Sequence, residues 1–172
     1  MSEPGEAQLE ALQGRLCYQF SDQTLLKRAL THRSVGKQHN ERLEFLGDAV
    51  IGLAAAAAFY ERFPEADEGV LSRLRALVVS GQSLAEIAKD MDLSSCLILG
   101  ESERKSGGRH RDSILADTLE ALIGAVALDA SPEKALEVAG VWLRSAVELA
   151  SPTDTIDAKT RLQEWCQARG EA

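Results

Sequence analysis

The sequence predicts an all-α fold, because helical periodicity runs through nearly all of it. Apolar residues recur at spacings of three and four, and no segment alternates convincingly as a strand would. The few glycines and prolines fall between the periodic stretches. At 172 residues the chain is long enough for one domain with a substantial core and too short for two large ones.

Polar residues that can cap a helix N-terminus mark where several helices are expected to begin. These start signals are Ser21 before residues 22–32, Ser83 with Glu86 as a capping box, and Ser131 followed by Pro132. A further helix begins near Asn40 and is expected to end at Pro64. A polar loop over residues 101–112 leads into an apolar helix.

Three carboxylates interrupt the helix that begins near Asn40, within the stretch NERLEFLGDAV at 40–50. At 3.6 residues per turn, Glu41, Glu44 and Asp48 share an arc of about 60°. Most of the remaining helix surface is apolar, so we expect a buried helix. Buried carboxylates need a cation, a proton or a water-filled cleft. This stripe therefore resembles a face of metal ligands.

A second acidic stripe lies on the apolar helix that follows the polar loop. Asp117 and Glu120 stand at i and i+3 there, so they share one face. Gly52 and Gly124 each follow an acid by one turn, and we expect them to let the two helix backbones approach closely. Such contact would bring together the carboxylates of Glu44, Asp48, Asp117 and Glu120.

Four oxygen ligands of this kind suit a hard cation, above all Mg²⁺, with Mn²⁺ as a substitute. Mg²⁺ commonly meets a substrate phosphate, so the chemistry expected is phosphodiester hydrolysis with one or two ions. The simpler alternative is a set of solvated acids on an amphipathic face. A di-iron site would need Glu-x-x-His pairs, which neither acidic stripe supplies.

The histidines and cysteines offer no second metal framework. His32 is interpreted as a hydrogen-bonding residue at a helix end, and His39 and His110 as loop residues. The cysteines are odd in number and widely spaced, so we expect reduced packing residues without disulfides. They are Cys17, Cys96 and Cys166.

Charge and hydropathy narrow the class of protein. A net charge of −8 argues against a protein that wraps nucleic acid with a basic surface alone. The acidic N-terminus does not resemble a signal sequence, and the longest apolar run is short and rich in alanine. We expect a cytoplasmic protein that does not enter a membrane.

These stretches together resemble the ribonuclease III family. NERLEFLGDAV is similar to the signature of that family, and DSILADTLEAL at 112–122 matches its second acidic helix. The similarity extends to ALTHRS at 29–34, DEGVLSRLRA at 67–76 and KSGGRHRDS at 105–113. The resemblance implies a helical, homodimeric endonuclease that uses Mg²⁺ to cut double-stranded RNA. It further implies 5′-phosphate and 3′-hydroxyl ends, a short 3′ overhang and the processing of rRNA and mRNA precursors.

The resemblance also assigns roles to individual residues. Glu44, Asp48, Asp117 and Glu120 match the metal and catalytic carboxylates, with Asp48 and Glu120 nearest the reacting water. Because no acid of the motif is missing, a non-catalytic RNA-binding or ribosome-associated module is the less favoured alternative. The remaining matches are Glu41 and Glu68 as cleft acids, and Lys105, Arg109 and Arg111 as phosphate contacts.

Three of these assignments have simpler alternatives. Glu68 lies near a helix start, where the helix dipole favours an acid in any protein. The basic residues of the loop could be a solvated charge run. A twofold dimer would offer one acidic centre to each strand of an RNA duplex. Phe45 lies beside the acid stripe and is our candidate for insertion into the partner subunit. The alternative is a core position.

Composition divides the chain into three parts. We expect a catalytic domain at 1–150, a polar linker at 151–158, and a segment at 159–172. That last segment, KTRLQEWCQARGEA, resembles the truncated start of a double-stranded-RNA-binding domain. A basic domain of that kind would supply affinity that the acidic catalytic part lacks.

Overall fold

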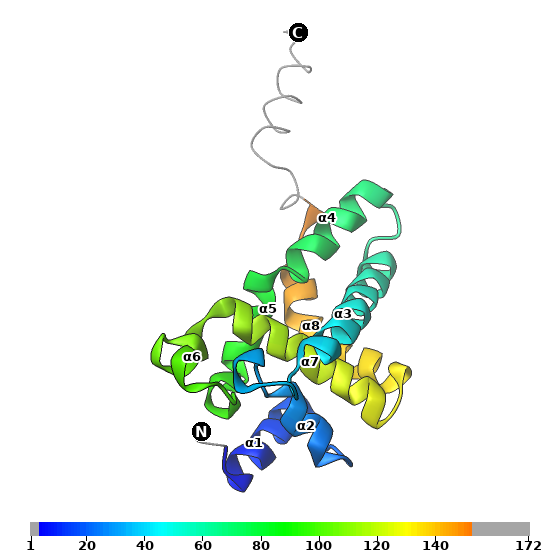
Figure 1. Ribbon diagram of the computed structural model, residues 1–172. Coiled ribbons are helices and arrows are strands. Elements are labelled where there is room, and N and C mark those ends of the chain that lie inside the picture. The colour runs from blue at the N-terminus through cyan, green and yellow to red at the C-terminus, as the bar shows by residue number, and fades with distance from the viewer. Residues whose placement is uncertain (1–3, 153–172) are drawn as a thin grey trace, which may run out of the picture.

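The computed structural model describes residues 4–152, which form a bundle of helices (Figure 1). The α-helices are α1 (Glu6–Leu16), α2 (Gln23–Ala29), α3 (Glu41–Arg62), α4 (Glu68–Val78), α5 (Gly81–Asp90), α6 (Glu101–Lys105), α7 (Asp112–Asp129) and α8 (Pro132–Leu149). Short 3-10 helices lie between them: η1 (Arg33–Val35), η2 (Leu93–Cys96) and η3 (Gly108–His110). Residues 4–152 contain no strand, which confirms the all-α prediction.

Helix α7 lies at the centre of the bundle. It contacts α2, α3, α5 and α8, and eleven of its residues between Ile114 and Val126 are buried. A helix surrounded in this way must be apolar on nearly every face, which explains its run of leucine, isoleucine, valine and alanine. Any charged group on α7 is therefore placed beside the core.

Two of the three predicted helix starts are displaced. Helix α2 is capped by Asp22, whose side chain accepts from the N–H of Thr24, so the cap lies one residue after Ser21. Helix α5 begins three residues before the predicted capping box, because the Ser80 hydroxyl accepts from the N–H of Ser83 at 3.3 Å. Ser131 caps α8 as predicted, with a proline in its first turn. The end of α3 before Pro64 is also confirmed.

Helices α3 and α7 cross at two glycines, Gly47 and Gly124. A Cβ atom added at Gly47 would stand 1.8 Å from the carbonyl oxygen of Glu120, and one at Gly124 would stand 2.0 Å from that of Leu43. The two backbones are therefore in direct contact. The prediction was right for Gly124 and wrong for Gly52, which has no atom within 4 Å of the Cβ position.

Helix α3 is not buried on every side, contrary to the prediction. Phe45 is 83% exposed, Tyr60 76% and Leu53 56%, and all three lie away from α7. Among the described residues α3 is the one helix that length and composition would allow to span a membrane. It packs against α7 and α8 instead, and Arg62 at its end donates to the carbonyls of Val147 and Glu148.

Some of the predictions about cysteines and domains concern residues outside the range that the structure describes. Cys96 is buried in the core, but Cys17 is exposed at the left-handed end of α1, so it is not a packing residue. Cys166, the segment 159–172 and most of the linker 151–158 lie outside residues 4–152.

The backbone contact between α3 and α7 predicts the effect of an added methyl group. Gly47→Ala should lower the free energy of unfolding by about 3 kcal/mol or more, because the helices must move apart. Gly140→Ala is the control, since Gly140 is exposed on α8 with open space at its Cβ position. That change should raise the free energy of unfolding by up to about 1 kcal/mol. Chemical denaturation measures both, and equal effects of the two variants would contradict the contact.

Candidate metal and catalytic site

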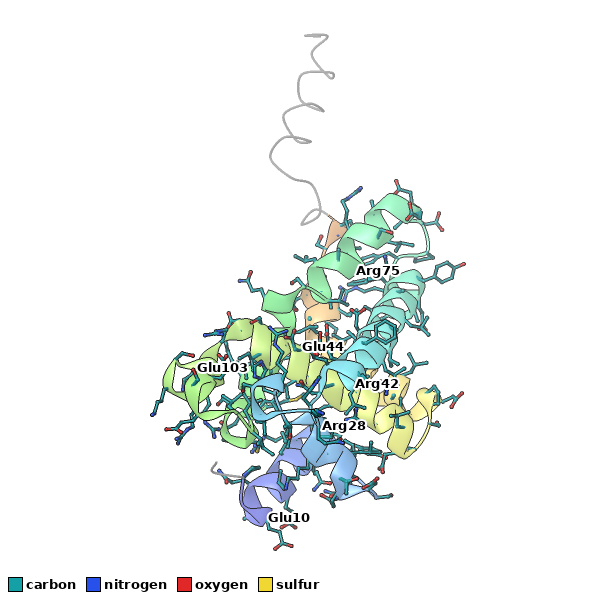
Figure 2. All side chains as sticks on the ribbon, viewed as in Figure 1. Glu10, Arg28, Arg42, Glu44, Arg75 and Glu103 are labelled. Carbon is teal, nitrogen blue, oxygen red and sulfur yellow. The ribbon has the colours of Figure 1, made fainter. Side chains whose placement is uncertain are left out.

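A polar cavity of about 200 Å³ opens where η1, α6 and the first turns of α3 and α7 meet. Figure 2 shows Glu44 near the centre of the bundle and Glu103 to its left on α6, and both residues line this cavity. The lining residues are His32, Arg33, Asn40, Glu41, Glu44, Glu103, Arg111, Ser113, Ile114 and Asp117. Most are charged or polar, so the cavity is suited to a charged ligand.

Three carboxylates from α3 and α7 converge here, and two of them, Glu44 and Asp117, line the cavity. One oxygen each from Glu44, Asp117 and Glu120 lies within 4.8 Å of the other two, and all three residues are partly buried. The glycine crossing causes this convergence, because the backbone at Glu120 touches Gly47 one turn from Glu44. Asp48 is exposed and lies outside this group of three, although it acts on Glu120 through its charge.

The convergence makes the carboxylates costly to ionise. Burial, and then the charges of Asp48, Asp117 and Glu44, raises the pKa of Glu120 to about 7. Burial also raises the pKa values of Glu44 and Asp117. The negative charges of Asp117, Glu41 and Asp48 raise the pKa of Glu44 further, whereas the positive charge of Arg33 opposes the rise. A cation among these oxygens would offset both the burial and the repulsion.

The oxygen-only donor set fits a hard divalent cation. Three carboxylates within 4.8 Å of one another can ligate one ion, and no histidine or cysteine joins the group within the described chain. Such ligands favour Mg²⁺ or Mn²⁺ over softer ions.

The two further acids lie in different places. Glu41 lines the cavity, where its carboxylate pairs with Arg33 at 3.1 Å. Glu68 begins α4, accepts from the hydroxyl of Ser72 at 2.7 Å, and does not line the cavity. Within a single chain the structure therefore brings only Glu41 to the site.

The three basic residues of the predicted loop, Lys105, Arg109 and Arg111, also lie in different environments. Arg111 lines the cavity and pairs with Glu103 at 2.8 Å. Arg109 instead donates to the carbonyl of Ser94 at 2.8 Å, which joins η3 to η2 and uses its guanidinium inside the protein. Lys105 pairs with Glu101 on the exposed side of α6. Only Arg111 stands beside the carboxylates.

Several cavity residues had no signal in the sequence. Glu103 has a side chain only 19% exposed and lies on helix α6, where the sequence predicted a polar loop. Asn40 is 3% exposed at the start of α3, and its side chain makes no cap hydrogen bond. Their positions depend on contacts between distant segments, so spacing along the chain could not identify them.

His32 is a helix-end residue, as predicted, and it also lines the cavity. It caps η1 by accepting from the N–H of Ser34. Burial lowers the pKa of His32, while the nearby charges of Glu103 and Asp117 oppose that effect. His39 lies just before α3, where its Nδ1 accepts from the N–H of Glu41, and His110 belongs to η3.

Phe45 lies on the other side of α3, outside the core. It lines a second, more apolar cavity with Leu43, Leu46 and Leu128, beside the side chains of Arg28 and Arg42. Leu128 is itself 59% exposed. The alternative that Phe45 is a core residue is wrong for the single chain.

The chain is similar in sequence to the members of one protein family. A family model described as ribonuclease-III-like matches residues 22–146. A protein named ribonuclease 3 from Pseudomonas fluorescens is 54% identical over 163 residues, which are 94% of this chain and 71% of that protein. A ribonuclease 3 from Alcanivorax borkumensis is 53% identical over 163 residues, 94% of this chain and 72% of that protein.

Solved structures agree with the sequence relatives. The nuclease domain of ribonuclease III from Campylobacter jejuni is 42% identical and superposes with a TM-score of 0.77, over 80% of this chain and 96% of that one. The Dicer structure from Pichia stipitis is 30% identical with a TM-score of 0.53, over 73% of this chain and 54% of that one. The chain therefore belongs to the ribonuclease III family of endoribonucleases.

Proposed function

We propose that this chain hydrolyses phosphodiester bonds of double-stranded RNA in a reaction that depends on Mg²⁺. The observation that carries the proposal is the group formed by Glu44, Asp117 and Glu120, an oxygen-only donor set in a family of endoribonucleases. The products are 5′-phosphate and 3′-hydroxyl ends. The cellular role is the processing of rRNA and mRNA precursors in the cytoplasm.

Glu44, Asp117 and Glu120 would hold the metal. Asp48, one turn after Glu44 on α3 and close enough to act on Glu120 through its charge, would be the fourth carboxylate of the site. A bound Mg²⁺ lowers the pKa of a coordinated water and stabilises negative charge on the phosphate, and Mn²⁺ can take its place. In the family pattern that this chain resembles, Asp48 and Glu120 would be the carboxylates nearest the reacting water. Burial and the neighbouring carboxylates raise the pKa of Glu120 to about 7 without metal, and a bound cation would offset both effects and favour the ionised ligand.

The residues around the carboxylates contact the RNA. Arg111, held by Glu103, offers a cation to the phosphate backbone at the cavity, and Lys105 offers a second on α6. Glu41 shapes the cavity rim together with Arg33. Glu68 belongs to the same acidic cleft in the assembled enzyme.

The functional unit is a homodimer built on the exposed apolar face of α3. Three apolar side chains of α3 are exposed in a single chain, Phe45, Leu53 and Tyr60. The exposed Leu128 of α7 lines one cavity with Phe45, and exposed apolar surface of this kind marks interfaces. The Campylobacter jejuni structure is described as showing structural flexibility in a region involved in dimer formation of its nuclease domain. Phe45 is the anchor, because its side chain is more exposed than those of Leu53, Tyr60 and Leu128.

The metal site predicts the effect of neutralising one ligand. Glu120→Gln should reduce the rate of Mg²⁺-dependent cleavage of duplex RNA by at least about a hundredfold, because an amide binds the metal weakly. Glu137→Gln, an exposed acid on α8, is the control and should cleave as the unaltered chain does. Gel assays with duplex RNA at saturating protein measure the rates. Comparable cleavage by both variants would refute the site.

The raised pKa of Glu120 predicts how stability changes with pH when metal is absent. The folded value of about 7 exceeds the ordinary value of 4.5, so the unfolded chain loses this proton first as pH rises. Relative to Glu120→Gln, the unaltered protein should lose stability between pH 4.5 and about 7 and then level off. Denaturation in EDTA across this range tests it. A constant difference would show that Glu120 is not strained by burial and repulsion.

The proposed interface predicts a monomer when Phe45 is charged. Phe45→Glu should abolish the dimer, since an interface anchor is lost and a carboxylate must be desolvated. Phe45→Leu, which stays apolar, is the control and should remain dimeric. Sedimentation velocity distinguishes the two, and a dimer of unchanged affinity in Phe45→Glu would exclude this residue as the anchor.

A further inference from the structure

The ring of His32 is fixed by two hydrogen bonds to one of its ring nitrogens. Its Nδ1 lies 3.2 Å from the backbone nitrogen of Ser34 and 2.9 Å from the hydroxyl of the same residue. That hydroxyl also accepts from the N–H of Gly100 at 2.9 Å. A backbone hydrogen bond joins the same two segments, since the N–H of His32 donates to the carbonyl of Ile98 at 3.0 Å.

This arrangement determines which ring nitrogen carries the proton. A backbone N–H can only donate, so Nδ1 must accept from Ser34 and cannot be protonated. The Ser34 hydroxyl uses an oxygen lone pair for Gly100, which leaves its own hydrogen free to donate to Nδ1 as well. The neutral ring therefore carries its hydrogen on Nε2.

The Nε2–H group is a donor that the described protein does not use. No acceptor within residues 4–152 is hydrogen-bonded to it, although His32 lines the cavity that holds Glu44 and Asp117. The negative charges of Glu103 and Asp117 act to raise the pKa of His32, but neither carboxylate is hydrogen-bonded to its ring. Because His32 lines this cavity and its Nε2–H group has no acceptor among the described residues, that group can donate to an acceptor on a ligand.

We infer that His32 contacts the substrate, donating from Nε2 to a non-bridging oxygen of the phosphate that is cleaved, and that Ser34 positions its ring. The inference rests on the proposed function, because it assigns a role within that site. A phosphate is the acceptor that fits, since a metal ion accepts no hydrogen bond and a water coordinated to it donates. His32 thus adds a neutral donor to the charge stabilisation of the carboxylate-held cation.

Two amide variants separate the donor from the cap. In His32→Asn the amide oxygen can replace Nδ1 as the acceptor for Ser34, but no donor reaches the position of Nε2. In His32→Gln the amide nitrogen can reach that position. Cleavage of duplex RNA is measured in single turnover at saturating protein and low salt, over a series of Mg²⁺ concentrations. A thermal melt of each variant verifies that the fold is retained.

Loss of a hydrogen bond to a charged group predicts a rate about ten- to a hundredfold lower for His32→Asn at saturating Mg²⁺. The Mg²⁺ concentration at half-maximal rate should not change, and His32→Gln should recover part of the rate. A rate for His32→Asn within twofold of the unaltered chain would overturn the inference. So would a loss that high Mg²⁺ fully restores, since His32 would then act through the metal ligands.

A substrate with sulfur in place of one non-bridging oxygen at the cleaved phosphate gives an independent measure. Sulfur is a weak acceptor, so one of the two diastereomers should slow the unaltered chain more than it slows His32→Asn. Equal effects in both proteins for both diastereomers would overturn the contact. An unaltered chain that cuts no duplex RNA would overturn the proposed function itself, and the inference with it.

Discussion

The crossing of α3 and α7 at Gly47 and Gly124 is the contact on which the rest of the molecule depends. Side chains at these positions would collide with backbone carbonyls, so only glycine allows the helices to touch. The contact brings the acid stripe of α3 beside that of α7 and places Glu44, Asp117 and Glu120 within 4.8 Å of one another. The packing that stabilises the core also holds these carboxylates close enough to repel one another. A bound cation would relieve that repulsion.

The sequence predicted the acid stripes because helix geometry is local, but not which apolar face of α3 is buried. On a wheel with Glu41 at zero, Gly47 and Ile51 lie at about 240° and 280°, beside the acids. Phe45 and Leu53 lie at about 40° and 120° on the other flank, and both are exposed. Two apolar faces flank the acids, and a single sequence does not distinguish the face for α7 from the face left open.

The rest of the cavity could not be predicted, because it depends on one long-range junction. Thr31 and Ile98 form an isolated bridge, and the N–H of His32 donates to Ile98. This junction carries His32 and, through α6, Glu103 to the same cavity as the carboxylates. Neither residue has a spacing that marks it, and the helix-end interpretation of His32 described its cap without its free donor.

The central claim, that the α3–α7 crossing builds a cation site, is tested most directly by the position of a bound ion. Crystals grown with millimolar Mn²⁺ would locate the ion by anomalous scattering. The account predicts a peak within roughly 2.5 Å of carboxylate oxygens from Glu44, Asp117 and Glu120. An ordered site without such a peak, or an ion bound only elsewhere, would contradict it.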